Sequence, residues 1–473
     1  MIALSLEQVA DVVGGELSSP AAGGRRVDRV CIDSREAGPG ALFVALPGTR
    51  SDGHLFVDGA LTAGAGGALV AAGRAHAVAV DAPLVLVDDP ADALLALGVW
   101  VRDTVDPLVV GITGSNGKTT TKDFIAAATA GRRTVANQGS FNNELGVPLT
   151  CCRLEHDSEL LVCEIGMRGG GQIAELAGLL RPAIGVVTSV AAVHLELLGT
   201  LEAIADAKAE LVEALAPDGV AVLAADDPLV AAMAQRTVAR TVTFGVSESA
   251  DWRARDVTLD DSARARFTLD SPAGTATVRV PLPGLHNVGN ALAALVAAVE
   301  AGVALPDAVA GLERATVSRW RLQFQRIAGI RVLNDAYNAN PTSTTAALRT
   351  LMQIPTGGRR WAVLGTMAEI GATSEHEHGR VGAAVAELGV DGLVTIGRPA
   401  AAIKAGADAA DPTGAERRWA VDDVAAAVDL LGTRLRPDDV VLVKASRSAA
   451  LEGVVSGLEQ RLRTPSATGD VRS

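Results

Sequence analysis

Short apolar runs alternate with Ala- and Leu-rich segments along nearly the whole chain, and this pattern constrains the fold more than any other feature of the sequence. The runs are rich in Val, Ile or Leu, and most of them lead into Gly, Asp, Ser or Thr. Buried strands joined by helices are typical of α/β proteins with parallel sheets, so we expect that class here. The predicted strands cover residues 108–112, 160–165, 184–188, 220–223, 332–334, 361–364, 393–396 and 440–443.

Breaks in this alternation divide the 473 residues into three units, the number expected at about 150 residues per domain. The first unit covers residues 1–105 and ends in a polar link, 102–107. The second covers 106–316, and its stretch 263–283 has the alternating polarity of a hairpin. The third covers 317–463 and begins with a basic segment that contains Arg319, Arg321 and Arg326. Residues 464–473 are polar without periodicity, and we expect a disordered tail there.

The composition excludes several classes of protein. A net charge of −13 argues against a broad nucleic-acid-binding surface, which needs clustered positive charge. No uncharged apolar stretch approaches the ~20 residues that span a bilayer, and the first residues do not have the pattern of a signal peptide. Four cysteines without a C-x-x-C pair favour a reducing compartment. We therefore expect a soluble, cytoplasmic, monomeric protein that binds no nucleic acid and inserts into no membrane.

Lysine is unusually rare in this chain. Of its 42 basic residues only five are lysines, namely Lys118, Lys122, Lys208, Lys404 and Lys444. Because generic surface charge is carried by arginine, each lysine becomes a candidate for chemistry, although solvated charge is the usual reason for a lysine.

The sharpest local motif is Gly-Ile-Thr-Gly-Ser-Asn-Gly-Lys-Thr-Thr at residues 111–120, which follows a predicted strand and opens a helix. In such a setting backbone N–H groups at the helix N-terminus bind phosphate, the lysine neutralises it and a threonine hydroxyl holds Mg²⁺. The general phosphate-loop pattern places a glycine five positions before Gly117, and Ile112 stands there instead. A glycine-rich turn without function is the alternative, but strand, loop, Lys-Thr and helix together favour the binding of a nucleoside triphosphate.

Two further side chains follow predicted strands. Glu164 stands at the end of the next predicted strand along the chain, 160–165. A carboxylate at such a strand end, beside the phosphate loop, is suited to hold Mg²⁺. A single acid at a strand end is, however, more often an ordinary loop residue. His194 follows another strand, and a lone histidine is more often structural than a ligand.

Together these motifs resemble those of the Mur ligases of peptidoglycan synthesis. The phosphate loop resembles their ATP motif more closely than the general pattern. His194 and Lys208 match, in order and rough spacing, a metal-binding histidine and a carbamylated lysine of that family. Segments 334–341, 364–371 and 443–448 resemble the MurF branch, which joins D-alanyl-D-alanine to a UDP-N-acetylmuramoyl-tripeptide. The D-x-Y-N-A-N-P stretch within 334–341 is the most specific to that branch.

The resemblance implies a three-domain architecture with a central, phosphate-loop-type, mostly parallel sheet and a Rossmann-like C-terminal domain. It implies an ATP-dependent peptide ligase that activates the tripeptide carboxylate as an acyl phosphate and yields UDP-N-acetylmuramoyl-pentapeptide, ADP and phosphate. The first unit would bind the UDP-linked substrate, the second ATP with two Mg²⁺ ions, and the third the incoming amine while closing over the nucleotide. Two anions meet in this reaction, so placed cations must screen them.

The resemblance also assigns site residues. The catalytic set is Lys118, His194, Lys208 and Arg321, and the metal ligands are Thr119, Glu164, His194 and Lys208 as a carbamate. The ATP-binding set is Gly114, Ser115, Asn116, Gly117, Lys118, Thr119, Thr120, Asn287, Asp335, Tyr337 and Asn338. The substrate-binding set is Ser34, Arg35, Asn142, Asn143, Lys444, Ser446 and Arg447.

A structural role remains an open alternative for two of the charged residues. A buried Lys208 with a lowered pKa could add CO₂ as a neutral amine, but an ordinary helix-face lysine would pair with an acid such as Glu213. Arg321 is either the arginine that enters from the third unit toward the γ-phosphate or one more surface arginine.

The nucleoside residues have their own alternatives. The amide of Asn287 can pair with adenine, but an Asn at a helix start is often an N-cap, which suits Asn290 better. Asp335 is suited to the ribose hydroxyls. Tyr337, the only tyrosine of the chain, is either a packed aromatic or a direct nucleotide contact.

Two positions depart from the family pattern, and one cluster is left without a role. Thr366 stands where the family has an acid, so we assign no charged role there, and Ala445 replaces a glycine with little expected effect. We expect His376 and His378, close together on a polar segment, to be solvated and assign them no metal.

Rival functions are another Mur-type or folylpolyglutamate-type ligase and, from a different class, a phosphate-loop ATPase switch. The segment 334–341 argues against the first, and a full-sized third unit argues against the second. Nothing in the sequence distinguishes lysine from diaminopimelate as the third residue of the tripeptide.

Overall fold

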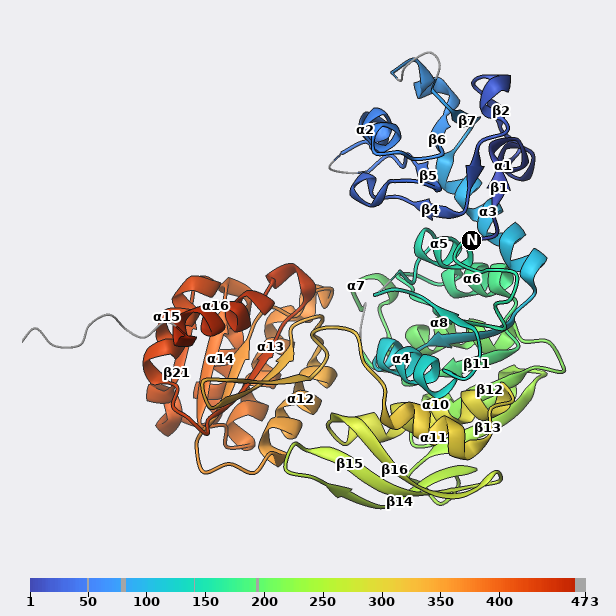
Figure 1. The fold of residues 1–473 in the computed structure, drawn as a ribbon. Coiled ribbons are helices and arrows are strands. Elements are labelled where there is room, and N and C mark those ends of the chain that lie inside the picture. Colours follow the sequence, from blue (N-terminus) through green and yellow to red (C-terminus); the bar gives the residue numbers. More distant parts are fainter. Residues whose placement is uncertain (49–50, 78–81, 140, 193–194, 464–473) are drawn as a thin grey trace, which may run out of the picture.

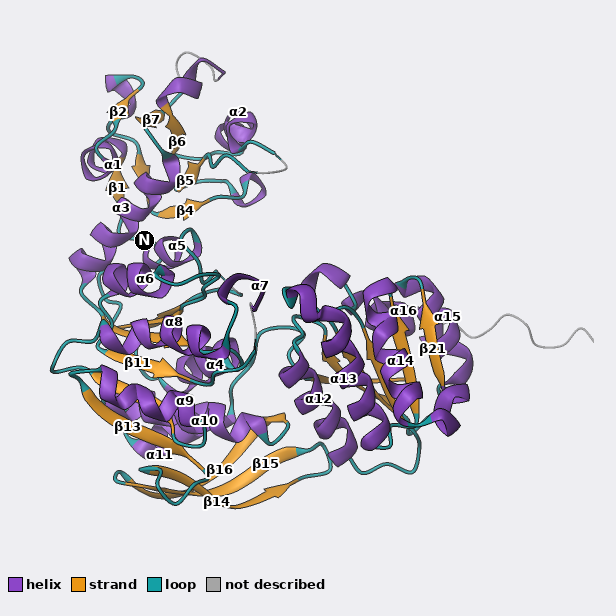
Figure 2. Cartoon of the chain, turned by 180° about the vertical axis from the view of Figure 1, so that it is seen from behind, coloured by secondary structure: helices purple, strands orange, loops and turns teal. Residues whose placement is uncertain are grey.

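The computed structural model describes residues 1–48, 51–77, 82–139, 141–192 and 195–463. Its helices and strands form three successive units, each built around one principal sheet (Figure 1). The first and third units each lie against the second and apart from one another, as the view from behind also shows (Figure 2). The expected disordered tail, 464–473, and His194 lie outside the described residues.

The first unit holds a five-stranded sheet in the order β2-β7-β6-β5-β4, parallel except for β2. Helix α1 begins with a capping box between Ser5 and Gln8, and α3 begins with Asp89 as N-cap followed by Pro90. The strands are β1 (Leu4–Ser5), β2 (Glu16–Leu17), β3 (Arg26–Val27), β4 (Arg29–Cys31), β5 (Ala41–Val44), β6 (Gly67–Ala71) and β7 (Leu84–Val87), and the helices are α1 (Leu6–Val13), α2 (Val57–Thr62) and α3 (Pro90–Val105).

The second unit holds a nine-stranded sheet in the order β16-β15-β14-β13-β12-β11-β8-β10-β9. Seven of these strands, from β14 across the sheet to β9, run parallel. Strands β15 and β16 add the expected antiparallel hairpin, with Ser271 opposite Gly274. The strands are β8 (Leu108–Thr113), β9 (Thr134–Ala136), β10 (Leu160–Glu164), β11 (Ile184–Val187), β12 (Val220–Ala224), β13 (Arg240–Gly245), β14 (Trp252–Leu259), β15 (Arg264–Ser271) and β16 (Gly274–Pro283). The helices are α4 (Lys118–Ala128), α5 (Gly146–Cys151), α6 (Gln172–Leu180), α7 (Leu195–Leu198), α8 (Leu201–Glu213), α9 (Pro228–Ala231), α10 (His286–Glu300) and α11 (Leu305–Glu313).

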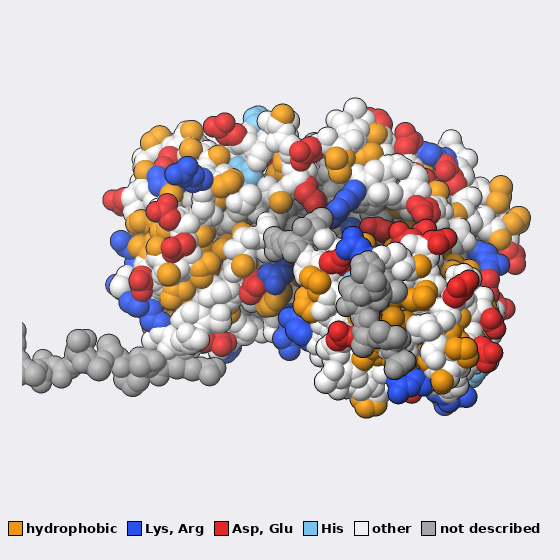
Figure 3. Space-filling view, turned by 90° about the horizontal axis from the view of Figure 1, so that it is seen from above, with side chains coloured by type: hydrophobic (Ala, Val, Ile, Leu, Met, Phe, Trp, Pro, Cys, Tyr) orange, Lys and Arg blue, Asp and Glu red, His pale blue; other side chains and the backbone are white. Residues whose placement is uncertain are grey.

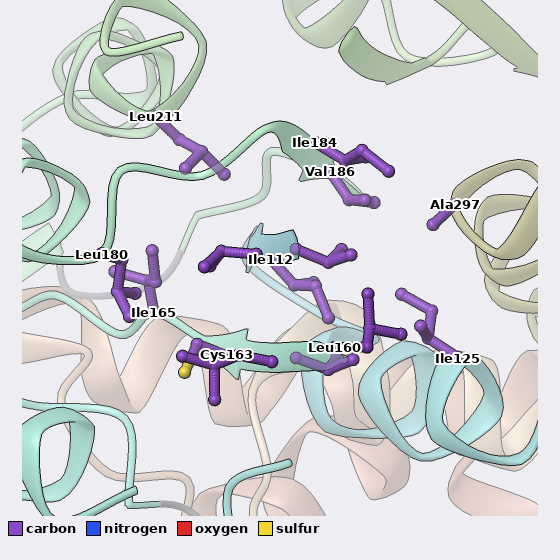
Figure 4. Packing of buried hydrophobic residues seen from close by; sticks show 14 of the residues in the cluster. Ile112, Ile125, Leu160, Cys163, Ile165, Leu180, Ile184, Val186, Leu211 and Ala297 are labelled. Carbon is purple, nitrogen blue, oxygen red and sulfur yellow. The ribbon is translucent and has the colours of Figure 1, made fainter. Parts of the chain in front are cut away.

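The central strands of this sheet are buried on both faces, which explains their continuous apolar sequence. Figure 4 shows side chains of β8, β10 and β11 packed together with Ile125 of α4, Leu211 of α8 and Ala297 of α10. Strand β8 lies between β10 and β11, so the chain passes from β8 to β9 and β10 on one side and then crosses to β11 on the other. The carboxyl ends of parallel strands at such a point form the usual ligand-binding crevice of α/β sheets.

The third unit holds a six-stranded sheet in the order β17-β18-β22-β19-β20-β21, in which only the β17–β18 pair is antiparallel. Its strands are β17 (Gln323–Ile327), β18 (Ile330–Asp335), β19 (Arg360–Leu364), β20 (Gly392–Ile396), β21 (Arg418–Val421) and β22 (Val440–Lys444). Its helices are α12 (Pro341–Gln353), α13 (Ser374–Glu387), α14 (Ala401–Ala410), α15 (Val424–Arg434) and α16 (Glu452–Arg463). All eight strands predicted from apolar runs are therefore present, and the α/β three-unit architecture is confirmed.

Two local expectations are wrong. The expected polar link at 102–107 is helical up to Val105, and Arg102 is buried because its guanidinium donates to the carbonyl of Leu179. His378 is not solvated but fully buried, with its Nε2 accepting from the N–H of Met367 and its Nδ1 bonded to the carbonyl of Ser374. Arg102 bonds to the backbone of a distant helix, and His378 bonds to the backbone of nearby turns. The sequence around each residue does not indicate these partners.

Ala445, the departure from the family glycine, is fully buried beside Gly365. A Cβ placed on Gly365 would stand 2.7 Å from the Ala445 methyl, closer than two carbons tolerate. The extra methyl is thus accommodated because Gly365, which directly follows the adjacent strand, has no side chain.

Within the described residues, the helices are all too short or too polar to cross a membrane.

Candidate active site

The phosphate loop joins β8 to α4 and has the conformation that its sequence predicts. Gly114 and Gly117 both have positive φ, and a Cβ on either would collide with Thr188 or Asn290. Helix α4 begins at Lys118, so its free N–H groups face the crevice. The Lys118 ammonium donates to the carbonyl of Gly114 at 2.7 Å, and burial lowers its pKa below the ordinary lysine value.

Glu164 stands at the tip of β10, directly beside this loop. Its Oε2 accepts a hydrogen bond from the Thr119 hydroxyl at 2.6 Å, and its Oε1 accepts one from the Asn142 amide at 2.7 Å. The carboxylate is buried, and within the described parts of the chain both of its hydrogen-bond partners are neutral. The Lys118 ammonium interacts with this carboxylate through its charge but donates its hydrogen bond to Gly114, so the carboxylate oxygens are suited to a further cation.

Lys208 lies on α8 and is almost completely buried. Burial, together with the nearby charge of Lys118, lowers its pKa well below the ordinary lysine value. Glu213, the acid that an ordinary helix-face lysine would pair with, forms its ion pair with Arg236. A lowered pKa favours the neutral amine, which is the form that adds CO₂.

The third unit reaches the phosphate loop with two side chains. Arg321, on the linker before β17, donates from its guanidinium to the Thr119 hydroxyl at 2.7 Å. Asn340, the N-cap of α12, donates to the side-chain oxygen of Asn116 at 2.7 Å. Residues more than two hundred positions apart in sequence thus meet at the N-terminus of α4.

Arginine–aromatic stacking fixes this linker. The guanidinium of Arg321 lies 4.2 Å from the ring centre of Tyr337, and that of Arg447 lies 4.7 Å from the ring of Trp320. The residues flanking Arg321, Trp320 and Leu322, both have left-handed backbone conformations. The Nε of Arg321 is buried without a hydrogen-bond partner among the described residues, so this donor stays free to meet an anion.

Asp335 and Lys444 form a buried ion pair at the tips of the adjacent strands β18 and β22, with 2.6 Å between Oδ2 and Nζ. Oδ1 of Asp335 accepts from the N–H of Leu322, and the Lys444 ammonium also donates to the carbonyl of Asn338. The two residues that the resemblance assigns to ribose and dipeptide therefore contact each other. Ser446 donates to the carbonyl of Ala339 and accepts from the N–H of Ala368.

Asn287 and Asn290 lie in the first turns of α10, but neither caps it. The N-cap position is Leu285, which makes no side-chain bond. The Asn287 amide donates to the carbonyl of Pro283 and accepts from Asn290, whose oxygen also meets the Thr121 hydroxyl. This pair links α10 to α4 beside the crevice.

Arg35 and His54 of the first unit bond to nearby residues of their own unit. Arg35 is exposed and pairs with Asp33, the N-cap of the short turn Ser34–Glu36. His54 is buried, with Nδ1 bonded to Asp52 and Nε2 accepting from the N–H of Ala71, so it holds its own segment together.

A cleft of about 1300 Å³ runs between the second and third units and brings most of the expected site residues together. Figure 3 shows it from above as a hollow between two lobes, with Lys and Arg side chains at its border. The cleft extends to Ile32, next to Asp33, but Ser34, Arg35, Gly114 and Lys208 are not part of its lining. The expected residues that line it are Ser115, Asn116, Gly117, Lys118, Thr119, Thr120, Asn142, Asn143, Glu164, Asn287, Arg321, Asp335, Tyr337, Asn338, Lys444, Ser446 and Arg447.

Two asparagines at this site, Asn340 and Asn137, are not among the residues expected from the sequence. Asn340 lies inside the quoted segment 334–341, so its position was already marked by that motif. Asn137 follows the short strand β9 and bonds to the backbone of Glu164, and no local sequence signal indicates it.

Oxygen ligands are what Mg²⁺ prefers, and the Thr119 hydroxyl and the Glu164 carboxylate supply them within hydrogen-bond distance of each other. Glu164 is buried and both of its described hydrogen-bond partners are neutral, so the residues present fit a divalent cation. In the portions that the structure describes, no cluster of three or more His, Cys, Asp or Glu residues is present.

Comparison with known proteins agrees with this geometry. Models of the Mur ligase family match all three units: its catalytic domain at residues 26–98, its middle domain at 112–298 and its glutamate ligase domain at 320–447. The chain therefore belongs to the Mur ligase family, and within it to the MurF branch.

Relatives and solved structures support the branch. The UDP-N-acetylmuramoyl-tripeptide--D-alanyl-D-alanine ligase of Mycobacterium tuberculosis is 43% identical over 97% of this chain and 98% of its own. The ligase of the same name from Escherichia coli is 36% identical over 97% and 99%. The crystal structure of MurF from Acinetobacter baumannii has a TM-score of 0.85 at 30% identity and covers 97% of this chain and 99% of its own. MurF from Thermotoga maritima in complex with ADP has a TM-score of 0.79 at 28% identity, covering 92% and 98%.

Proposed function

We propose that this protein joins D-alanyl-D-alanine to UDP-N-acetylmuramoyl-tripeptide with the hydrolysis of ATP to ADP and phosphate, making the pentapeptide precursor of peptidoglycan. The observation that carries the proposal is that Arg321 and Asn340 of the third unit meet Thr119 and Asn116 of the phosphate loop in one cleft. Full-length relatives of the same branch bear this activity in their names. The MurF structure from Thermotoga maritima with ADP supports ATP as the nucleotide.

The chemistry needs a carboxylate to attack the γ-phosphate, and two anions must therefore approach each other. Lys118 and the N-terminus of α4 bind the phosphates. Arg321 lines the cleft from the side of the third unit, where its guanidinium can donate to the transferring phosphoryl group. The resulting acyl phosphate is then open to the amine of the dipeptide, and phosphate leaves as the amide forms.

Thr119 and Glu164 would hold Mg²⁺, with His194 and the carbamate of Lys208 as ligands of a second ion. When bound, Mg²⁺ supplies positive charge that screens the phosphate oxygens. The support for a carbamate is the burial of Lys208 and its lowered pKa. His194 enters this proposal through its place in the sequence alone.

The units divide the work in this proposal. Residues 1–105 bind the UDP-linked substrate through Ser34 and Arg35, with Asn142 and Asn143 of the second unit near its muramoyl part. Residues 106–316 bind ATP, with Asn287 on adenine and Asp335, Tyr337 and Asn338 of the third unit on the nucleoside. Residues 317–463 bind the dipeptide with Lys444, Ser446 and Arg447 and close over the nucleotide.

We further propose that the protein acts as a monomer in the cytoplasm. All four cysteines are unpaired and buried, and burial raises the pKa of Cys151 to about 12, so these thiols suit a reducing compartment.

The experiment that tests the function is the release of ADP and phosphate with each substrate present or omitted. A ligase releases them only when both the UDP-linked tripeptide and D-alanyl-D-alanine are present, with the pentapeptide as product. Release without either would instead favour the ATPase switch, and product with a different amine would favour another ligase of the family.

Lys118→Ala is the matching variant. It removes the cation of the phosphate loop and should lower kcat by roughly a thousandfold. Lys404→Ala is its control, because Lys404 pairs with Asp408 on α14 and does not line the cleft. Retained turnover in Lys118→Ala would contradict the assignment of the loop.

A further inference from the structure

The first two turns of α4 present polar side chains to two neighbouring segments. Thr119 and Asp123, one turn apart, both contact the linker of the third unit: Thr119 accepts from Arg321, and Asp123 Oδ2 accepts from the N–H of Ser318 at 2.7 Å. Asp123 Oδ1 also pairs with the ammonium of Lys122 at 2.9 Å. The linker is thus bonded along one face of α4.

Lys122 extends this set of contacts away from the linker. Its side chain is almost fully buried, and besides Asp123 its ammonium donates to the carbonyl of Asn137 at 2.8 Å. A buried ammonium needs its partners, so Asp123 and the Asn137 carbonyl hold Lys122 in place. Its role lies next to the phosphate loop rather than on the phosphates.

Asn137 continues the edge strand β9 by means of its side chain. The backbone pairing of β9 with β10 ends at Ala136 opposite Val162. Beyond that point the Asn137 amide pairs with Glu164 in the manner of a peptide group: Oδ1 accepts from the Glu164 N–H at 2.6 Å, and Nδ2 donates to the Glu164 carbonyl at 3.3 Å. The buried amide therefore fixes the backbone of β10 at the residue that carries the carboxylate.

The same amide also fixes the loop that holds the other oxygen of this carboxylate. Nδ2 of Asn137 donates to the carbonyl of Phe141 at 2.6 Å. The next residue, Asn142, donates to Oε1 of Glu164 and accepts from the N–H of Gly166 at 2.7 Å. One side chain thus sets both the backbone of Glu164 and the loop that orients its carboxylate.

We propose that Asn137 is a positioning residue for the metal ligand Glu164, and that Lys122 and Asp123 couple it to the third-unit linker at Ser318. This inference rests on the proposed role of Glu164 in holding Mg²⁺. Residues that orient a metal ligand commonly change metal affinity or activity by about 10- to 100-fold when they are removed. Attachment of the third unit and orientation of the metal ligand then depend on the same buried contacts.

The test measures Mn²⁺, in place of Mg²⁺, by electron paramagnetic resonance titration of the full-length protein with ADP present. Asn137→Ala should weaken Mn²⁺ binding by about 10- to 100-fold, because the backbone and the loop lose their common partner. Thr129→Val is the matched control: Thr129 is fully buried at the other end of α4, and its hydroxyl donates to the carbonyl of Ile125. It should lower the Tm without changing Mn²⁺ affinity. Equal affinities in the two variants would overturn the proposal.

The coupling to the linker is tested by combining Asp123→Ala with Asn137→Ala. If both act through the same contacts, the double variant should lose less Mn²⁺ affinity than the product of the two single losses. A loss of Mn²⁺ affinity in the double variant equal to the product of the two single losses would show that the residues act independently. Lys122 and Asp123 would then no longer be part of the proposal.

Glu164→Gln separates this inference from the proposed function. Unchanged Mn²⁺ affinity in Glu164→Gln would reject the metal site itself. Weakened affinity in Glu164→Gln, with none in Asn137→Ala, would reject only the positioning role.

Discussion

Glu164 and Asp335 are two carboxylates in equivalent places with opposite surroundings. Each ends a parallel strand and lines the same cleft, one on β10 of the second unit and the other on β18 of the third. Glu164 is hydrogen-bonded to the neutral groups of Thr119 and Asn142. Asp335 is neutralised by the ammonium of Lys444.

The difference shows what a strand-tip acid can do. A buried carboxylate that no protein cation hydrogen-bonds gains most from a cation that arrives with the ligand. One already held in an ion pair acts as a fixed hydrogen-bond acceptor and holds its segment together. Both carboxylates stand at the tip of a strand, so the difference in their roles comes from the groups that bond to them.

Replacing the unpaired acid should have the largest effect. Glu164→Gln keeps the size of the side chain but removes the charge that attracts Mg²⁺, and we expect kcat to fall roughly a thousandfold, or about 4 kcal/mol. Stability should be unchanged or higher, because a buried charge is removed. The measurements are ADP release at saturating ATP and a thermal melt. Glu159→Gln, an exposed acid just before β10, is the control, and comparable loss in both would break the comparison.

Removing the partner of the paired acid should also lower stability, beyond any loss of dipeptide binding. Lys444→Met leaves Asp335 buried without a counter-charge, and we expect a loss of about 3–5 kcal/mol in the free energy of unfolding of the third unit. Denaturant unfolding measures it. Adding Asp335→Asn to this variant should recover part of the loss. An unchanged free energy of unfolding in Lys444→Met would show that Asp335 does not depend on its ion pair, and the contrast with Glu164 would fail.

The smallest expected effect concerns the bond that joins the third unit to the Glu164 site. Arg321→Lys cannot both stack on Tyr337 and donate to Thr119, so we expect a loss of about 1 kcal/mol, or roughly fivefold to tenfold in kcat/KM for ATP. Arg326→Lys, at an exposed position of β17, is the matched control. Steady-state kinetics with varied ATP compares them, and equal values would show that Arg321 is one more surface arginine.

Much of the fold can be predicted from the sequence, because each buried parallel strand is encoded by a local run of apolar residues. The conformation of the phosphate loop is local too, and its glycines mark the places where a side chain would collide. The contact between Asp335 and Lys444 is different, since it depends on the register of β18 against β22, 109 residues away. No pattern near either residue encodes that register.

The same reason explains the residues that were missed or misjudged. Asn137 acts through two hydrogen bonds to a strand that follows much later in the chain, and His378 is buried by its bond to Met367 of another segment. Local polarity predicts exposure, but a polar side chain is buried wherever the fold brings a backbone group to meet it.

The contact of Gly365 with Ala445 restricts how this protein can change over generations. Just past the ends of β19 and β22 there is room for one methyl group, because a second one would lie 2.7 Å from the first. An alanine at position 365 therefore requires glycine at position 445 and a shift of the Leu451 side chain, which lies 2.9 Å from the same Cβ. The two positions are thus coupled, and a change at one limits what the other can become.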